Sequence, residues 1–171
     1  MQRVLVIGSP GSGKTTLSTR LAGKLGVPVY HLDLHHWVAG WSYRDAAEAR
    51  AAVRSLCETP AWVMDGNFAE SFDLRMPRAD TLVWLDYPRR TCVRRIVMRT
   101  IRDYGKQMPD LPQGCPEQFD AGVLRFAWRF PRQSRPAIFD AIQRYGSHLA
   151  VFTLRDDRAV AAFAREHGGG P

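Results

Sequence analysis

Residues 8–15 are the feature of this sequence that most constrains its fold. They read Gly-Ser-Pro-Gly-Ser-Gly-Lys-Thr and match the phosphate-loop pattern G-x-x-x-x-G-K-[ST] at every fixed position. The apolar run over residues 3–7 predicts a buried strand before this loop, and leucines at 17, 21 and 25 predict a helix after it, ending at Gly26. A strand, a glycine-rich loop and a helix in this order predict an α/β fold with a nucleoside triphosphate site.

The chemistry of the loop follows from its residue types. Glycines allow backbone N–H groups to turn toward phosphate oxygens, and the N-terminus of the following helix adds a positive dipole. Lys14 is expected to reach the β- and γ-phosphates of ATP, and Thr15 is expected to offer its hydroxyl to Mg²⁺. The residues expected to bind nucleotide here are Gly8, Ser9, Pro10, Gly11, Ser12, Gly13, Lys14, Thr15 and Thr16.

The composition limits what else the chain is. Its 171 residues and 45% hydrophobic content suit one α/β domain with a proper core. No stretch approaches a membrane span, and the first strand begins almost at Met1, so we expect no signal peptide. Three scattered cysteines argue against a disulfide framework and favour a cytoplasmic protein. The net charge of +7 admits either a nucleic-acid surface or arginines gathered around phosphates.

Two further predicted strands end in an aspartate. The strand over 27–33 ends at Asp33, and the strand over 61–65 ends at Asp65. Because the carboxyl ends of parallel strands share one edge of a sheet, both aspartates are expected beside the phosphate loop. Asp65 fits the Walker-B pattern and is expected, with Thr15, to hold Mg²⁺. Asp33 could orient water on Mg²⁺, accept a proton from an acceptor hydroxyl, or only cap a turn.

A second group of residues is expected to face the molecule that accepts the phosphate. Trp37 and Trp41 could form an apolar wall for this acceptor, or could pack beneath a flap. Asn67, just past a strand end, could hydrogen-bond the acceptor or serve only the turn. The expected acceptor-binding residues are Asp33, Trp37, Trp41, Asn67 and Arg75.

The remaining elements are predicted from apolar periodicity and from proline and glycine signals. They are, in order, a helix (43–56), a strand (80–86), an arginine-rich helix from Pro88, an irregular segment (108–116), a helix (117–130), a Pro-rich break (131–136), a further helix, a strand (148–154), a closing helix (156–166) and a frayed tail (168–171). No internal repeat or low-complexity linker divides the chain.

This order of elements resembles that of the adenylate-kinase-like P-loop kinases, and within that group the chain is similar to the DNA topology modulation proteins over residues 4–154. The likeness rests on several local runs, which are His31-Leu32-Asp33 with Trp37 and Trp41, Asp65-Gly66-Asn67, Arg75 with Ala79-Asp80, Leu85-Asp86-Tyr87-Pro88, and Gly114-Cys115-Pro116-Glu117. Met108 stands where an arginine is common in the family. Asn67-Phe68 replaces the Phe-Pro-Arg turn by which adenylate kinases help bind AMP, so AMP is not implied as the acceptor.

The resemblance implies a fold, a division of the chain and roles for four arginines. It implies a three-layer sandwich with a five-stranded parallel sheet, in a single domain over 1–171 with an acceptor-binding insertion at about 34–60 and a lid at about 105–136. Arg95 and Arg99 would lie at the base of the lid and contact adenine or phosphates, while Arg132 and Arg135 would close from its far end. With Lys14 and Asp33, these arginines complete the expected catalytic set. The lid is expected to be open and mobile without nucleotide.

Two function classes follow from these observations. The first is a kinase that transfers the γ-phosphate of Mg·ATP to an unidentified small molecule or nucleotide. The second is a nucleotide-regulated nucleic-acid-binding protein that affects DNA topology, which the family's name and the basic charge both suggest. The arginine placement favours the kinase, because basic residues crowd the segments expected to cap the triphosphate and no nucleic-acid-binding motif occurs.

Overall fold

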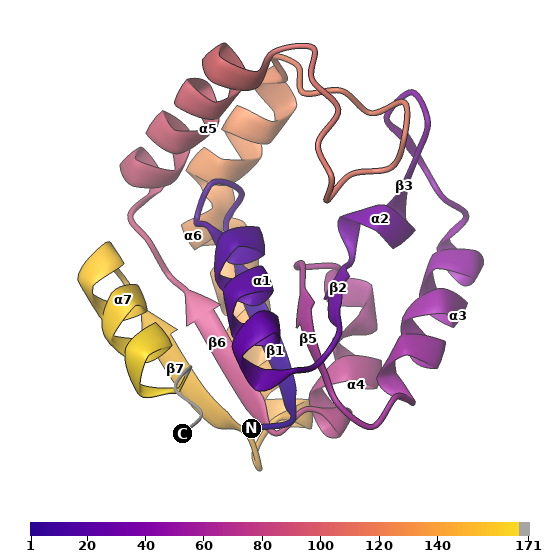
Figure 1. The fold of residues 1–171 in the computed structure, drawn as a ribbon, viewed down its shortest axis with the longest axis vertical. Helices are drawn as coiled ribbons and strands as arrows, with labels where there is room; N and C mark the ends of the chain where they lie inside the picture. The colour runs from indigo at the N-terminus through magenta and orange to yellow at the C-terminus, as the bar shows by residue number, and fades with distance from the viewer. Residues whose placement is uncertain (168–171) are drawn as a thin grey trace.

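The computed structural model describes residues 1–167, and a five-stranded parallel sheet forms its centre (Figure 1). The strands lie in the order β2-β5-β1-β6-β7. Their bounds, in that order, are Val29–His31, Trp62–Asp65, Arg3–Gly8, Thr81–Leu85 and Ala150–Leu154. β5 and β6 are buried throughout and β1 is buried from its second residue on, as their unbroken apolar runs predict. The predicted fold class is confirmed.

The register of the strands decides which residues meet at the functional edge. β1 is the central strand, and its Val6 pairs with Asp65 of β5 while its Gly8 pairs with Leu85 of β6. All strands run parallel, so their carboxyl ends meet at one edge of the sheet. The phosphate loop leaves β1 at this edge, between the ends of β5 and β6.

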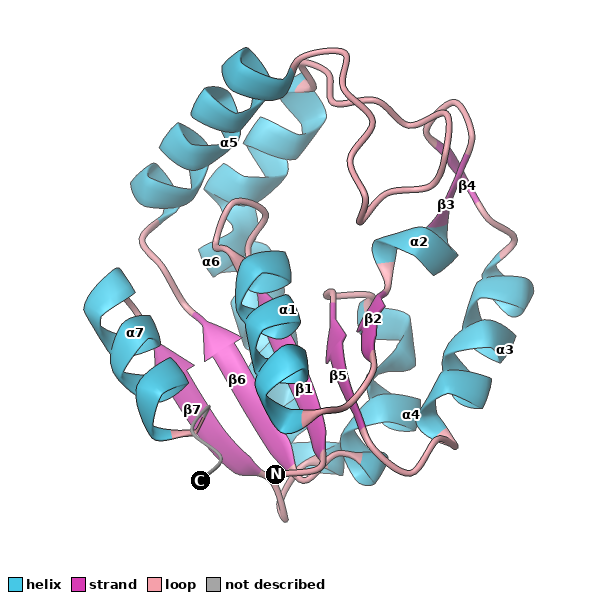
Figure 2. Cartoon of the chain, in the orientation of Figure 1, coloured by secondary structure: helices cyan, strands magenta, loops and turns pink. Residues whose placement is uncertain are grey.

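Helices cover both faces of the sheet (Figure 2). Because side chains alternate along a strand, each inner strand contributes to two separate cores. One core combines Val4, Val6, Val63, Val83 and Leu85 with residues of α1 (Lys14–Leu25) and α7 (Asp157–Glu166). The other combines Leu5, Ile7, Met64, Leu82 and Trp84 with residues of α3 (Ala46–Cys57), α4 (Phe72–Arg75) and α6 (Ala121–Tyr145). Helix α5 (Arg89–Asp103) packs along α6.

The insertion after β2 holds more structure than the sequence predicted. It begins with the short helix α2 (Asp33–His36) and continues into a hairpin of β3 (Trp37–Val38) and β4 (Ser42–Tyr43). The predicted helix at 43–56 begins only at Ala46. The reason is that Asp45 caps it, with a carboxylate that accepts hydrogen bonds from the N–H groups of Ala47 and Glu48.

The predicted break at residues 131–136 is wrong. Helix α6 runs without interruption over 25 residues and contains both Pro131 and Pro136. Buried side chains on either side of the prolines, among them Ala127, Phe130 and Ile138, anchor it to the core. Tertiary packing therefore outweighs the local cost of the prolines. The irregular lid segment is confined to the connection between α5 and α6.

Short turns connect the remaining elements. The 3₁₀ turns Ala69–Ser71 and Met76–Arg78 flank α4. Over the described chain, no helix has both the length and the apolar character that crossing a membrane requires. The frayed tail expected at 168–171 lies outside the described residues.

Candidate functional site

The phosphate loop is held between the end of β6 and the first turns of α5. Gly11 has a φ of +75°, and a Cβ at this position would lie 2.4 Å from the carbonyl oxygen of Cys92. Only glycine allows the loop to lie this close to α5. The first turn of α1 has no side-chain cap, because its N-cap residue is Gly13. The Ser12 hydroxyl is buried and has no hydrogen-bond partner among residues 1–167. Both features suit an anion in the loop.

Lys14, the first residue of α1, is folded back onto the loop. Its ammonium donates a hydrogen bond to the Ser9 carbonyl oxygen, 3.0 Å away. Burial lowers the pKa of Lys14, while the carboxylates of Asp33 and Asp65 pull it back up. The Lys14 ammonium thus lies between the two carboxylates and a loop whose hydrogen-bond donors are not all paired. A bound polyphosphate would pair with both the ammonium and these donors.

Asp65 lies at the carboxyl end of β5 and is almost fully buried. Its carboxylate accepts a hydrogen bond from the Ser18 hydroxyl and contacts His31 Nδ1 at 2.7 Å. The hydrogen bond to Asp65 is the main reason that the pKa of His31 is raised, and burial opposes it. Ser18 also donates to the Thr15 carbonyl oxygen, so Asp65 is tied to the helix turn that carries Thr15. Sequence reasoning missed both Ser18 and His31 as partners of Asp65.

Asp33 lies in the first turn of α2, beside the same edge of the sheet. The Leu32 N–H donates to the Asp65 carbonyl oxygen at 3.0 Å, which fixes the chain next to β5. The Asp33 side chain reaches solvent, yet protein atoms crowd it, and this loss of hydration raises the pKa of its carboxyl. Lys14 opposes the shift. The two predicted strand-end aspartates therefore meet at the phosphate loop.

Two expected acceptor-binding residues, Asn67 and Arg75, bond backbone groups of the protein itself. Asn67 clamps the start of the loop, because its amide nitrogen donates to the Gly8 carbonyl oxygen at 2.8 Å and its amide oxygen accepts from the Gly8 N–H at 3.2 Å. Arg75 is completely buried, and its guanidinium donates to the Ser71 hydroxyl and to the carbonyl oxygens of residues 66–68. The expectation that Arg75 contacts the acceptor is therefore wrong, because a completely buried guanidinium cannot reach a ligand. Burial lowers the pKa of Arg75 to about 10, which leaves it charged near neutrality.

The four expected catalytic arginines lie in different surroundings. Arg95 pairs with both carboxylate oxygens of Asp157 in α7 and lies 3.4 Å from the Ser12 carbonyl oxygen. Arg99 pairs with Glu117 at 3.1 Å, and its positive charge acts on Lys14. Arg135 pairs with Asp86, just past β6. Arg132 is exposed on α6. The structure thus places the first three within existing ion pairs and leaves Arg132 in solvent.

The two tryptophans of the insertion belong to an aromatic cluster. Trp37 stacks on Tyr43 with ring centroids 4.4 Å apart and meets Trp41 edge to face at 5.5 Å. His36 joins the cluster through Tyr43 and Phe68. This cluster lies beside Asp33, because α2 leads directly into β3.

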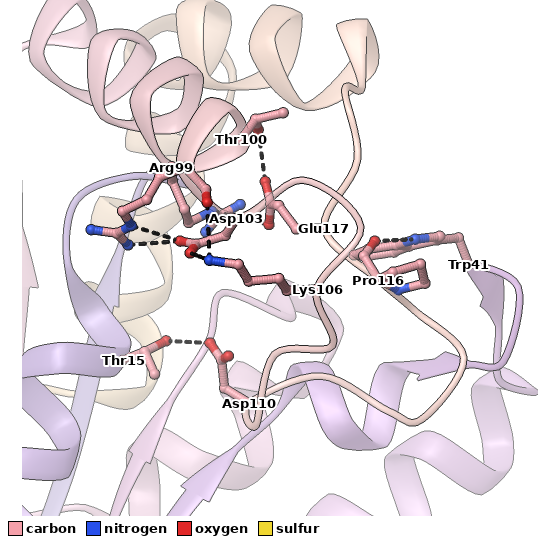
Figure 3. Close-up of polar contacts among 10 residues, drawn as sticks. Thr15, Trp41, Arg99, Thr100, Asp103, Lys106, Asp110, Pro116 and Glu117 are labelled. Atoms are coloured by element: carbon pink, nitrogen blue, oxygen red, sulfur yellow. Dashed lines mark hydrogen bonds and ion pairs between the residues drawn. The ribbon is translucent and has the colours of Figure 1, made fainter.

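The connection between α5 and α6 is docked on the rest of the site, so the expected open lid is not what the structure contains. The Gly40 N–H donates to the Gly114 carbonyl oxygen at 3.0 Å, and Trp41 Nε1 donates to that of Pro116 at 3.2 Å. From the same loop, Asp110 accepts a hydrogen bond from the Thr15 hydroxyl at 3.1 Å (Figure 3). The lid therefore touches both the hairpin and the phosphate loop.

Glu117 anchors the lid to helix α5. It was not predicted as a site residue. It is buried, accepts a hydrogen bond from the Thr100 hydroxyl at 2.7 Å and pairs with Arg99 of α5 (Figure 3). Its only sequence signal was membership of the Gly114-Cys115-Pro116-Glu117 run. Asp110 carried no separate signal.

Oxygen donors dominate the centre of the site. Within residues 1–167, no group of three or more His, Cys, Asp and Glu side chains is arranged to hold a metal by itself. Thr15, Asp33 and Asp65 nevertheless bring the hydroxyl and carboxylate oxygens that Mg²⁺ prefers, and such a site normally leaves the remaining positions to phosphates and water. The residues present fit Mg²⁺ carried by a nucleotide.

Comparison with solved structures confirms the fold over nearly the whole chain. A shikimate kinase from Bacteroides thetaiotaomicron is 19% identical with a TM-score of 0.52, covering 96% of this chain and 95% of that one. A putative kinase from Chloroflexus aurantiacus is 20% identical with a TM-score of 0.52, covering 98% and 99%. A shikimate kinase from Acinetobacter baumannii in complex with shikimate is 16% identical with a TM-score of 0.58, covering 97% and 90%. At these identities the likeness establishes the fold and nothing finer.

Sequence comparison establishes the family. No curated protein matches the chain significantly. A family model described as AAA domain matches residues 4–121, which is well over half of the chain and includes the phosphate loop, both strand-end aspartates and the docked lid. The chain therefore belongs to this AAA domain family.

Proposed function

We propose that the protein is a kinase that transfers the γ-phosphate of Mg·ATP to a small-molecule acceptor. The observation that carries this proposal is the meeting of Lys14, Asp33 and Asp65 at the uncapped start of α1, under a docked loop. A cation, two carboxylates and a helix N-terminus are the parts that phosphoryl transfer needs for positioning and charge stabilisation. The kinase fold of the solved neighbours supports the same reaction class by analogy.

On the nucleotide side, the loop residues 8–16 would bind the triphosphate through backbone N–H groups and hydroxyls. Lys14 would exchange its hydrogen bond with the Ser9 carbonyl oxygen for the β- and γ-phosphates. Thr15 and Asp65 would hold Mg²⁺, and Asp65 would act directly or through water, because Ser18 and His31 both contact the same carboxylate oxygen, Oδ2. The ion, when bound, neutralises charge on the transferring phosphate.

On the acceptor side, Asp33 would orient the attacking hydroxyl and take its proton. Its raised pKa, caused first by burial, brings this carboxyl closer to the range in which a general base is effective. The cluster around Trp37 and Trp41 would form the apolar wall of the acceptor pocket. We propose that the chain works as one domain, with residues 34–60 contributing this pocket and the connection before Ala121 acting as the lid.

The arginines would supply positive charge to the transferring group from the lid side. Arg99 is the best placed, because the positive charge of its guanidinium already acts on Lys14 and lowers the pKa of that residue. Arg95 borders the loop at Ser12 and would contact the nucleotide there. Arg135 would have to release Asp86, and Arg132 would have to turn inward from solvent, so their parts depend on a rearrangement around the bound nucleotide.

Calorimetry with a non-hydrolysable ATP analogue and Mg²⁺ tests the nucleotide half of the proposal. Lys14→Ala should weaken binding by about 10- to 100-fold or more, because hydrogen bonds to a charged group are worth about 1.5–3 kcal/mol each. Lys24→Ala is the matched control, since Lys24 lies in the last turn of the same helix and bonds the Ala164 carbonyl oxygen. Equal affinities for wild type and Lys14→Ala would contradict the assignment.

A nucleic-acid role is the second candidate, and the exposed arginines of two neighbouring helices favour it. Arg90 and Arg94 of α5 and Arg125, Arg129 and Arg132 of α6 are all exposed. The resemblance to the DNA topology modulation proteins points the same way. Under this alternative, DNA would bind with an affinity that falls steeply as salt rises, and the ATP analogue would not be required.

A further inference from the structure

Asp110 is the lid residue that reaches the phosphate loop. Its carboxylate oxygen Oδ2 lies 3.1 Å from the Thr15 hydroxyl, which comes from the other end of the chain (Figure 3). Among residues 1–167, no lysine, arginine or histidine lies within ion-pair distance of Asp110. An acidic side chain without a cation thus lies beside a site built for a polyanion.

The loop around Asp110 is preformed. Gln107 bridges it internally, because its amide nitrogen donates to the carbonyl oxygens of Met108, Leu111 and Pro112 and its amide oxygen accepts from the Gly114 N–H. Gln107 also pairs with Pro116 as an isolated antiparallel bridge. These bonds give the loop a fixed shape. Docking of the loop therefore determines where the Asp110 carboxylate lies.

The separation of the two oxygens matches neighbouring positions around one metal ion. Mg²⁺ binds oxygen at about 2.0–2.1 Å in octahedral geometry, so two adjacent ligands lie about 3.0 Å apart. Thr15 is already the hydroxyl proposed to hold Mg²⁺. A carboxylate placed beside the γ-phosphate without an intervening cation would repel it, whereas the same carboxylate on the ion would be attracted.

We propose that Asp110 is a lid-borne ligand of the Mg²⁺ that accompanies the nucleotide, sharing the ion with Thr15. This inference rests on the proposed function and adds a regulation to it. Asp110 exchanges its hydrogen bond with Thr15 for the ion, and the lid is closed by the metal rather than by phosphate charge alone. Nucleotide without Mg²⁺ then leaves the lid less firmly docked.

Asp110→Asn tests the proposal, with Asp120→Asn as the matched control. Asp120 lies in the same connection and caps α6 through Gly122 and Val123, a role that asparagine fills equally well. Affinity for the ATP analogue is measured by calorimetry with Mg²⁺ and with EDTA, and hydrogen exchange of residues 106–117 is followed in parallel. An unfolding curve confirms that each variant is folded.

The expected result has three parts. In wild type and Asp120→Asn, Mg²⁺ strengthens binding and slows exchange in residues 106–117. In Asp110→Asn, affinity with Mg²⁺ falls by about tenfold or more, which is the size of effect that loss of a group supporting a metal site produces. Its affinity in EDTA equals or exceeds that of wild type, because one negative charge has been removed, and its lid no longer responds to Mg²⁺.

Two results would overturn the proposal. Tighter Mg²⁺-dependent binding by Asp110→Asn would mean that the Asp110 carboxylate competes with the ion instead of binding it. Unchanged binding and unchanged lid protection would mean that it has no part in the metal site. If either occurs while Lys14→Ala still weakens binding as expected, the proposed function stands without this inference. Failure of wild type to bind the analogue would end both.

Discussion

The two halves of the candidate site are held together in different ways. The phosphate loop is fixed by close approach to the core, as Gly11 against α5 and the Asn67 clamp on Gly8 illustrate. The lid is fixed by single hydrogen bonds to loops far away in sequence, such as Trp41 to Pro116 and Gly40 to Gly114. The phosphate loop is therefore preorganised. The part of the lid before the buried Glu117 is instead held to the hairpin by contacts that each cost little to break.

This difference fits the demands of phosphoryl transfer. A triphosphate is bound best by donors that need no rearrangement, because every ordering step reduces affinity. A lid must open to exchange substrate and close to exclude water, so its contacts have to be individually weak. Variants in the two parts of the site should therefore differ in how strongly they affect stability and binding.

Arg75→Met should destabilise the protein most. The guanidinium holds the carbonyl oxygens of residues 66–68 from within the core, and each buried group left unsatisfied costs about 1–3 kcal/mol. We expect a loss of at least about 3 kcal/mol in the free energy of unfolding, measured in urea. Arg132→Ala, which removes an exposed arginine, should change it by less than about 0.5 kcal/mol. Equal losses of stability in the two variants would show that Arg75 does not stabilise the turn at residues 66–68.

Gly11→Ala should be the next largest change. Its Cβ would meet the Cys92 carbonyl oxygen at 2.4 Å, on top of the cost of about 1–2 kcal/mol for a left-handed backbone with a side chain. Gly13→Ala shares the positive φ but meets nothing within 4 Å, so only the backbone cost applies. Urea unfolding should rank Gly11→Ala clearly below Gly13→Ala. Similar values for both would mean that close packing on α5 is not what fixes the loop.

Gly114→Ala, in the lid, should loosen the lid locally instead of destabilising the whole protein. Gly114 also has a positive φ, and its Cβ would lie 3.0 Å from the Cβ of Ala39 in the hairpin. We expect the contact with Ala39 to be relieved by local undocking, so global stability should fall by no more than the backbone cost of about 1–2 kcal/mol while hydrogen exchange in residues 106–117 becomes faster. If Gly114→Ala destabilised the whole protein as much as Gly11→Ala, the two halves would not differ as described.

The sequence predicted the strand, loop and helix around the phosphate loop well, because the determinants of this architecture are local. The loop pattern, the strand before it and the strand-end aspartates each follow from short stretches, and the parallel topology brings Asp33 and Asp65 to one edge. The sequence left two roles open for Asn67 and did not indicate the buried role of Arg75, because both roles depend on which backbone groups face these side chains after folding. A polar residue beside a site has the same sequence signature whether it faces a ligand or supports a loop.

The lid was predicted least well, for two physical reasons. Helix α6 passes through Pro131 and Pro136 because its buried face packs on the core, a tertiary effect that local proline signals do not contain. The docked position of the loop depends on bonds such as that between Thr15 and Asp110, which lie 95 residues apart. Nothing in either local stretch indicates its partner.

Asp33→Asn should have the smallest effect on nucleotide binding but a large effect on the rate of phosphate transfer. The acceptor can be sought by incubating the protein with Mg²⁺, ATP labelled on its γ-phosphate and a pool of small metabolites freed of protein and nucleic acid. The wild-type protein should transfer the label to a small molecule. Lys14→Ala should bind Mg·ATP weakly and transfer little label, and Asp33→Asn should bind Mg·ATP normally but transfer far more slowly. Label found only in free phosphate, or transfer that survives in Asp33→Asn, would contradict a kinase whose carboxylate at Asp33 activates the acceptor.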